Sequence, residues 1–193
     1  NVNMKNTNYY EQRDIKNRRK MSKYLETLPD YCRDFIIGIE NNTSSLTRYN
    51  YAMDLYVFFN FLEKSIFHKK AIEITLQDIN TIKSQRIEQY LSDLSSYMID
   101  DNLYRNTERG KARKLASLRS FFKYLYNHDY IDGNVASKIS TPKLHNKEII
   151  RLERDEVKRL MNAIENPCEF SQRQKEYNKN TFERDNAIVT LFL

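Results

Sequence analysis

Residues 105–127 read RNTERGKARKLASLRSFFKYLYN, and this stretch decides the predicted fold. The whole sequence has only three Gly and three Pro, and it is rich in residues that favour helices. We therefore expect a helix from Asn106 to about Asn127 in an all-α protein. Apolar side chains in it recur at three- and four-residue steps, the period of an α-helix with one buried face, at Leu115, Leu118, Phe122 and Leu125.

The same stretch carries the positive charge of the chain. Seven basic residues and one acid, Glu108, lie between Arg105 and Lys123, a surplus equal to the net charge of +6 of all 193 residues. On a helical wheel Arg109 and Arg113 project away from the apolar stripe. A solvated helix face usually mixes charge signs, so this face favours an anionic partner, and nucleic acid is the partner we prefer.

The basic face also allows two alternatives to a nucleic-acid partner. In the simpler alternative the face is only solvated and binds nothing. An anionic membrane surface is the weaker alternative, because the apolar stripe has the spacing of a packed core rather than of a lipid-binding face.

Further helices are predicted on both sides of the first. Residues 1–28 form either a basic arm or a short helix, and Pro29 suits the first turn of a helix that runs toward Asn41. Ser44 or Ser45 caps a long helix, with apolar residues at Leu46, Tyr49, Met53, Tyr56, Phe59 and Leu62. Thr75-x-x-Asp78 is a capping box that opens a short helix, and another helix carries Ile87 to Met98 and ends at Asp100-Asp101-Asn102.

The composition excludes several kinds of site. The scattered glycines form no phosphate-binding loop and no G-x-G-x-x-G motif. Cys32 and Cys168 stand far apart, and no histidine lies near either of them, so neither a zinc site nor a disulfide is expected. We predict no cofactor and no metal.

The predicted location is the cytoplasm. The sequence has no apolar run of about 18 residues, and its first residues are polar, so we expect neither a membrane span nor a secretory leader. Two cysteines without a predicted disulfide agree with reduced thiols.

The helical periodicity of the sequence is lost after His128, which predicts a domain boundary. Residues 132–150 include Gly133 and Pro142 and show little periodicity, so we interpret them as a linker. Residues 29–131 are then one helical domain, and residues 151–193 begin a second. In the second, a helix opens near Glu153 and Asn166-Pro167 stops it, a polar stretch follows, and an apolar helix from Ala187 ends the chain. We expect most of this second domain to be missing from the sequence.

Two motifs in the expected order resemble a known family. Thr47-x-x-x-Tyr51-x-x-Asp54-Leu55-x-x-Phe58-x-x-Phe61-Leu62 resembles the first long helix of the core-binding domain of tyrosine recombinases, the Xer and phage-integrase group. RKLASLRSFFKYL at 113–125 resembles the last helix of that domain. Leu152-x-x-Asp155-Glu156-Val157 and Arg184-Asp185-x-Ala187-Ile188 resemble the opening helices of the catalytic domain, so the resemblance covers residues 43–193.

The resemblance implies a fold and a function. The fold is a SAM-like helical bundle, the core-binding domain, followed by the first helices of a truncated catalytic domain. Such a protein binds a half-site of duplex DNA together with other recombinase protomers, and it cuts and rejoins DNA through a 3′-phosphotyrosyl intermediate without metal or ATP. The catalytic residues of the family are expected beyond Leu193, so none is assigned here.

The candidate DNA-binding residues come from the two long predicted helices. For Thr47 and its neighbours, capping and solvent exposure are the alternative, and Arg119 lies beside the apolar stripe, where it could pair with an acid instead. Asp54 is expected to be a structural partner of a nearby base. The candidates are Thr47, Arg48, Asn50, Arg109, Lys111, Arg113, Lys114, Ser117, Arg119 and Lys123.

Two functions of different classes remain alternatives to a recombinase. One is a non-catalytic helical DNA-binding regulator. The second is a helical protein-interaction module, which would not bind duplex DNA even at low salt.

Overall fold

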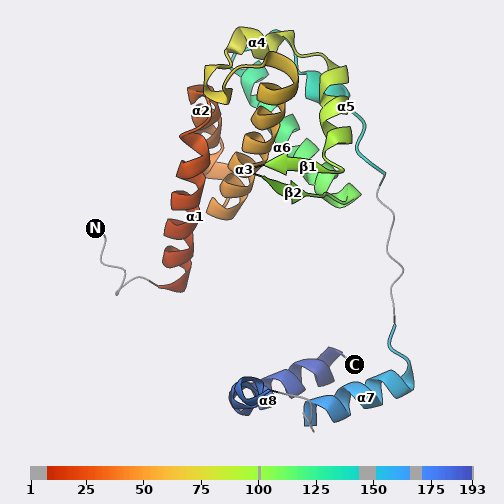
Figure 1. The fold of residues 1–193 in the computed structure, drawn as a ribbon. Coiled ribbons are helices and arrows are strands. Elements are labelled where there is room, and N and C mark those ends of the chain that lie inside the picture. Colours follow the sequence, from red (N-terminus) through yellow and green to blue (C-terminus); the bar gives the residue numbers. More distant parts are fainter. Residues whose placement is uncertain (1–7, 100, 144–150, 166–170, 193) are drawn as a thin grey trace. The chain divides into compact units, whose positions relative to one another are not determined.

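The structure is a computed structural model that describes residues 8–99, 101–143, 151–165 and 171–192. The chain divides into two compact units, Asn1–Leu144 and His145–Leu193 (Figure 1). We describe each unit separately.

The basic N-terminal segment, which the sequence left open between an arm and a helix, forms helix α1 (Tyr9–Leu25). A capping box starts it, because the Asn8 side chain accepts from the backbone N–H of Glu11 while the Glu11 carboxylate accepts from the N–H of Asn8. Figure 1 shows α1 beside α3, and the two helices are in contact along their length. Pro29 is the N-cap of α2 (Asp30–Gly38), which a short 3-10 turn, η2 (Glu40–Asn42), follows.

The first long helix is α3 (Ser45–Phe61), and Ser44 caps it as predicted by accepting from the N–H of Thr47. It continues into a π-helical segment, η3 (Leu62–Phe67), and ends at His68, whose φ of 54° is left-handed. Leu55, Phe58 and Phe59 are fully buried. Leu46 was expected in the same stripe but is 47% exposed, because Ser45 and Arg48 occupy the packed side of the first turn instead.

The next elements are η4 (Ala71–Glu73), α4 (Leu76–Thr81) and α5 (Ser84–Asp93). The predicted capping box opens α4, since the Thr75 hydroxyl accepts from the N–H of Asp78 and the Asp78 carboxylate accepts from the N–H of Thr75. The predicted extension of α5 to Met98 is wrong, because α5 stops at Asp93.

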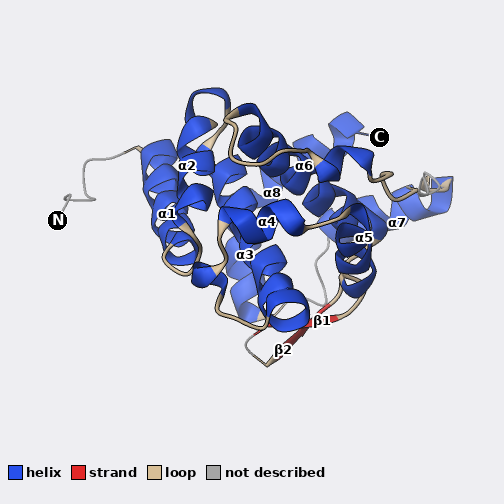
Figure 2. Cartoon of the chain, turned by 90° about the horizontal axis from the view of Figure 1, so that it is seen from above, coloured by secondary structure: helices blue, strands red, loops and turns tan. Residues whose placement is uncertain are grey.

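An antiparallel hairpin takes the place of that extension, with strands β1 (Tyr97–Ile99) and β2 (Asn102–Tyr104). Tyr97 pairs with Tyr104, and their rings stack 5.5 Å apart, a cross-strand contact that no helix could form. Figure 2 shows the hairpin in red at the edge of the helices of this unit. The mostly helical fold class is confirmed, with this strand pair as the exception.

The second predicted helix is α6 (Glu108–Asn127), and it forms the centre of the core. Its Leu115, Leu118, Phe122 and Leu125 are fully buried, as the period predicted. Phe121 is also fully buried, and its ring lies 5.4 Å from that of Phe35 on α2 and 6.2 Å from that of Phe59 on α3. Aromatic contacts of this kind therefore join three helices.

The first part of the expected linker packs against the N-terminal unit. After α6 the chain forms a 3-10 turn, η5 (Val135–Lys138), that contacts α6 and α5. Ile131, Ala136 and Ile139 are buried there. These apolar residues are too widely spaced to show a period, which is why the sequence pattern suggested a linker. Residues 144–150 of that linker lie outside the described residues.

The second unit contains α7 (Arg154–Glu165) and α8 (Gln172–Phe192), which contact each other. The stretch 171–180 was interpreted as a polar connection, but α8 begins at Gln172 and takes up the rest of that stretch. The predicted stop at Asn166-Pro167 and residue Cys168 lie outside the described residues. Among the described helices of either unit, none is both long and apolar enough to span a membrane.

We predict that Gly38→Ala destabilises the N-terminal unit, because a methyl group on Gly38 would overlap the Tyr124 ring of α6. Such overpacking typically costs about 1–3 kcal/mol of unfolding free energy. Gly133→Ala is the matched control, since a methyl group there would meet nothing within 4 Å. Urea denaturation of both variants measures the difference. Equal stability of the two variants would show that α2 does not pack against α6 in this way.

Candidate nucleic-acid interface

The strongest polar contact of the N-terminal unit surrounds the carboxylate of Asp54 on α3. This carboxylate is fully buried and accepts two hydrogen bonds of 2.7 Å from the guanidinium of Arg113. It also accepts from Lys114 Nζ at 2.9 Å and from Ser117 Oγ at 2.6 Å. The prediction that Asp54 is a structural partner of a nearby base is confirmed. We call these four residues the Asp54 cluster.

The cluster is stable because the buried carboxylate is fully hydrogen-bonded and each of the three side chains around it bonds to it. A buried carboxylate without hydrogen bonds would cost several kcal/mol, whereas here a bidentate guanidinium, an ammonium and a hydroxyl share it. Two cations face one carboxylate, so the cluster carries a net positive charge. It joins the middle of α3 to the first turns of α6.

The structure separates the predicted basic residues of α6 into two kinds. The side chain of Lys114 is 4% exposed and Ser117 is 1% exposed, so both point into the protein rather than toward a partner. Lys114 lies one helical turn before the buried Leu118 and therefore falls on the packed face. Arg113 differs, since its side chain is 44% exposed while it binds Asp54.

Arg119 fastens the segment after α6 to the helix. Its guanidinium donates to the Thr141 hydroxyl at 2.9 Å, and it also donates to the backbone carbonyls of Ala136 and Ile139. Arg119 therefore binds within the protein, as we considered, but its partners are carbonyl and hydroxyl oxygens rather than an acidic side chain.

Arg48 on α3 is buried as well. Its guanidinium donates to the carbonyl of Thr43 at 2.7 Å and to the carbonyl of Glu40 at 3.0 Å, and it forms a 3.2 Å ion pair with the Glu40 carboxylate. Arg48 therefore closes the turn between α2 and α3, and it does not project from the helix as its sequence position suggested.

The other candidates are exposed to different degrees. Arg109 and Lys123 are exposed, and within the described ranges no carboxylate lies within 4.0 Å of either. Lys111 is only 14% exposed and forms an ion pair of 3.2 Å with Glu108. Thr47 and Asn50 are half-buried near the start of α3, where the Thr47 hydroxyl lies 3.0 Å from that of Ser44.

The N-terminal ends of α3 and α6 lie toward the same end of the unit. Asp54 contacts Arg113, and further along both helices the rings of Phe58 and Phe122 lie 6.2 Å apart, so the two helices run in the same direction (Figure 1). The positive ends of both helix dipoles therefore add to the charge of Arg109 and Arg113. This end of the unit favours an anion such as a phosphodiester.

The sequence did not show that the basic residues of α1 lie next to α3. Lys20 lies over the ring of Tyr49 on α3, 5.6 Å from its centroid, so the basic face of α1 borders α3. The spacing of these basic residues in the sequence could have predicted a common face, because residues at three- and four-residue steps share one helix face. That face carries Arg13, Lys16, Lys20 and Lys23, all exposed.

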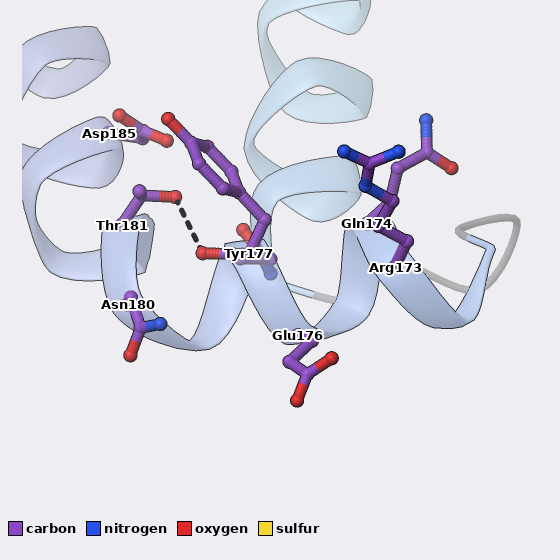
Figure 3. A pocket seen from close by; sticks show the side chains of 8 residues that line it. Arg173, Gln174, Glu176, Tyr177, Asn180, Thr181 and Asp185 are labelled. Carbon is purple, nitrogen blue, oxygen red and sulfur yellow. Dashed lines mark hydrogen bonds between the residues drawn. The ribbon is translucent and has the colours of Figure 1, made fainter.

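The second unit has a surface hollow of about 620 Å3 along α8 (Figure 3). Tyr177, Thr181 and Asp185 line it from successive turns, and the Thr181 hydroxyl donates to the Tyr177 carbonyl at 3.4 Å. Arg184 binds Asp185 at 2.7 Å, and this bond lowers the pKa of the Asp185 carboxyl below its usual range. Because one helix supplies the whole lining, the hollow does not assemble a catalytic set of residues.

Comparison with known proteins matches both the fold and the motifs. The family model described as "Phage integrase, N-terminal SAM-like domain" matches residues 34–129. A protein named tyrosine recombinase XerC from Caldanaerobacter subterraneus subsp. tengcongensis is 35% identical over 185 residues, which cover 91% of this chain and 48% of that protein. No solved structure matches significantly.

Two further relatives carry the same name. XerC of Leptospira interrogans serovar copenhageni is 34% identical over 127 residues, covering 64% of this chain and 35% of that protein. XerC of Syntrophus aciditrophicus is 32% identical over 131 residues, covering 67% and 39%. The chain thus spans less than half the length of these relatives.

We predict that Asp54→Ala lowers the unfolding free energy by about 3–5 kcal/mol, because it leaves Lys114 buried without a counter-charge. Asp93→Ala is the matched control, since Asp93 is exposed at the end of α5, and a surface change of this kind is expected to alter stability by less than about 0.5 kcal/mol. Chemical denaturation monitored by circular dichroism compares the two. A loss below about 1 kcal/mol in Asp54→Ala would contradict the structural role of the cluster.

Proposed function

Because the chain belongs to the tyrosine recombinase family of phage-type integrases, of which it carries the N-terminal SAM-like domain, we propose that it is the DNA-binding portion of a site-specific recombinase. The relatives bear the name of a recombinase, an activity that needs contact with duplex DNA. The N-terminal unit would bind one half-site of that DNA.

The observation that carries this proposal is the position of the exposed charge. Arg109 and Arg113 project from the first turns of α6, at the end of the unit where the N-terminal end of α3 also lies. Arginine binds phosphates and the guanine edge with two hydrogen bonds, and an α-helix fits the major groove. In this proposal Thr47 and Asn50 on α3 would contact the same duplex, and Lys123 would add a phosphate contact further along α6.

Hydrogen bonds inside the protein support a smaller set of proposed DNA contacts than the sequence suggested. Arg48, Lys114, Ser117 and Arg119 are bonded within the protein, so their part in DNA binding is to hold the helices in place. Lys111 takes a lesser part, because Glu108 pairs with it. Arg109 and Arg113 therefore become the principal contacts.

We propose that the full protein acts with other recombinase protomers on DNA in the cytoplasm. The second unit would begin the catalytic domain, whose tyrosine attacks a phosphodiester and forms a 3′-phosphotyrosyl bond. No described residue of this chain is assigned a catalytic role, and no cofactor is proposed. A non-catalytic DNA-binding regulator would use the same surface, so it remains the alternative.

We predict that Arg109→Gln weakens binding of the chain to duplex DNA, because it removes an exposed cation at the start of α6. If Arg109 contacts one phosphate, the slope of log affinity against log salt should fall by about 0.9. Fluorescence anisotropy with a labelled duplex, repeated over a range of salt, measures both quantities.

The matched control for this experiment is Lys70→Gln. Lys70 is exposed just before η4, in the segment that follows the C-terminal end of α3. Lys70→Gln removes one positive charge, as Arg109→Gln does. The affinity of the Lys70→Gln variant for duplex DNA, and its slope of log affinity against log salt, should stay close to those of the unmodified chain. If both variants lose affinity equally, net charge rather than the proposed surface governs binding.

The parent reading frame distinguishes a recombinase from a regulator. For a recombinase we expect the codons after Leu193 to encode a Thr-Gly-x-Arg segment, followed later by His-x-x-Arg and a single tyrosine. DNA sequencing of the region downstream checks this. A stop codon directly after Leu193 would favour the regulator.

A further inference from the structure

A groove of about 510 Å3 lies beside the Asp54 cluster. Its lining comes from four elements that are distant in sequence: the end of α1, the middle of α3, the hairpin and the start of α6. A volume of this size falls within the range of roughly 300–1000 Å3 that small-molecule sites occupy. The groove therefore has room for a ligand of the size of one nucleotide.

The charge of the groove suits an anion. Lys23, Arg113 and Lys114 line it, and its lining includes no carboxylate. The nearest counter-charge is Asp54, which is fully buried and already shared by Arg113 and Lys114. Two of the five N–H donors of Arg113 point to Asp54, so others are free to bind an oxygen at the exposed side of the guanidinium.

The walls of the groove are aromatic. Tyr24, Tyr56, Tyr97 and Tyr104 all line it. Tyr104 is 45% exposed and its ring stacks on that of Tyr97, so one face of the Tyr104 ring is packed while part of the residue stays accessible. A planar ring fixed in this way is a stacking platform for a base.

The phenol of Tyr24 adds no negative charge to the groove. Burial raises the pKa of Tyr24 above its usual value, as do its neighbours Tyr49, Tyr104 and Tyr56. Tyr24 therefore stays protonated and neutral at physiological pH. It does not oppose an anion in the groove.

We propose that this groove binds a single unpaired nucleotide, with its phosphate on Lys23 and Arg113 and its base on the ring of Tyr104. The combination of cations and exposed aromatic rings fits a nucleotide, which has both a phosphate and a base. An inorganic anion would not stack on the tyrosines, and an apolar ligand would not pair with the cations. The inference that the nucleotide belongs to a DNA strand rests on the proposed function. The inference that the groove binds a nucleotide rests only on the residues that line it.

Short oligonucleotides test the proposal with the full chain. Fluorescence anisotropy would compare labelled pentathymidylate with an abasic deoxyribose-phosphate strand of the same length at one low salt concentration. We expect the abasic strand to bind the unmodified chain about tenfold more weakly, because it cannot stack. Tyr104→Ala should weaken binding of pentathymidylate about tenfold and leave the abasic strand unaffected. Lys23→Gln should weaken both strands.

Two control variants separate stacking from folding. Tyr104→Phe keeps the ring and should keep the affinity for pentathymidylate. Tyr126→Ala removes a tyrosine that is 48% exposed on α6 and does not line the groove, so it should also bind normally. Thermal melting monitored by circular dichroism verifies that each variant is folded.

The outcomes distinguish this inference from the proposed function. Equal binding of the two strands by the unmodified chain, or no loss in Tyr104→Ala, would overturn the nucleotide site while duplex binding could still hold. Free thymidine monophosphate that competes as well as the strand would show that the groove takes nucleotides from solution, which supports the site but not a DNA source. Loss of all binding to strands and to duplex by the unmodified chain would overturn both proposals.

Discussion

The N-terminal unit depends on one buried carboxylate. Asp54 on α3 binds Arg113, Lys114 and Ser117 on α6, and so fixes both the rotation of each helix about its axis and the register between them. Apolar packing alone tolerates small shifts, whereas a bidentate pair with bonds of 2.7 Å does not. Arg113 is thereby held in one orientation with part of its guanidinium at the surface.

This arrangement gives the excess of positive charge on α6 two uses. Lys114 and Arg119 hold the protein together, while Arg109 and Lys123 stay at the surface with no carboxylate near them in the described part of the chain. Arg113 belongs to both groups, so the residue that fixes the fold also faces the proposed ligands. A mutation of Arg113 would therefore change stability and binding together.

The tyrosines show a similar division. The rings of Tyr31 and Tyr90 are buried among phenylalanines, and burial raises the pKa of both phenols, so they remain neutral members of the core. Tyr97 and Tyr104 instead form the hairpin that closes one side of the groove. These four tyrosines thus either pack in the core or line the groove.

The sequence by itself determined the two long helices of the N-terminal unit, α3 and α6, and the family. The period of Leu115 to Leu125, the Ser44 cap and the Thr75 capping box are local signals, because each depends on residues within a turn or two. It also identified Asp54 as a partner of a base. It could not show which bases, since Arg113 lies 59 residues away from Asp54 along the chain. Only the tertiary structure decided that Lys114, Ser117 and Arg48 point inward, that the hairpin replaces the end of a helix, and that α1 borders a groove. These features depend on contacts between distant segments, and local periodicity carries no information about them.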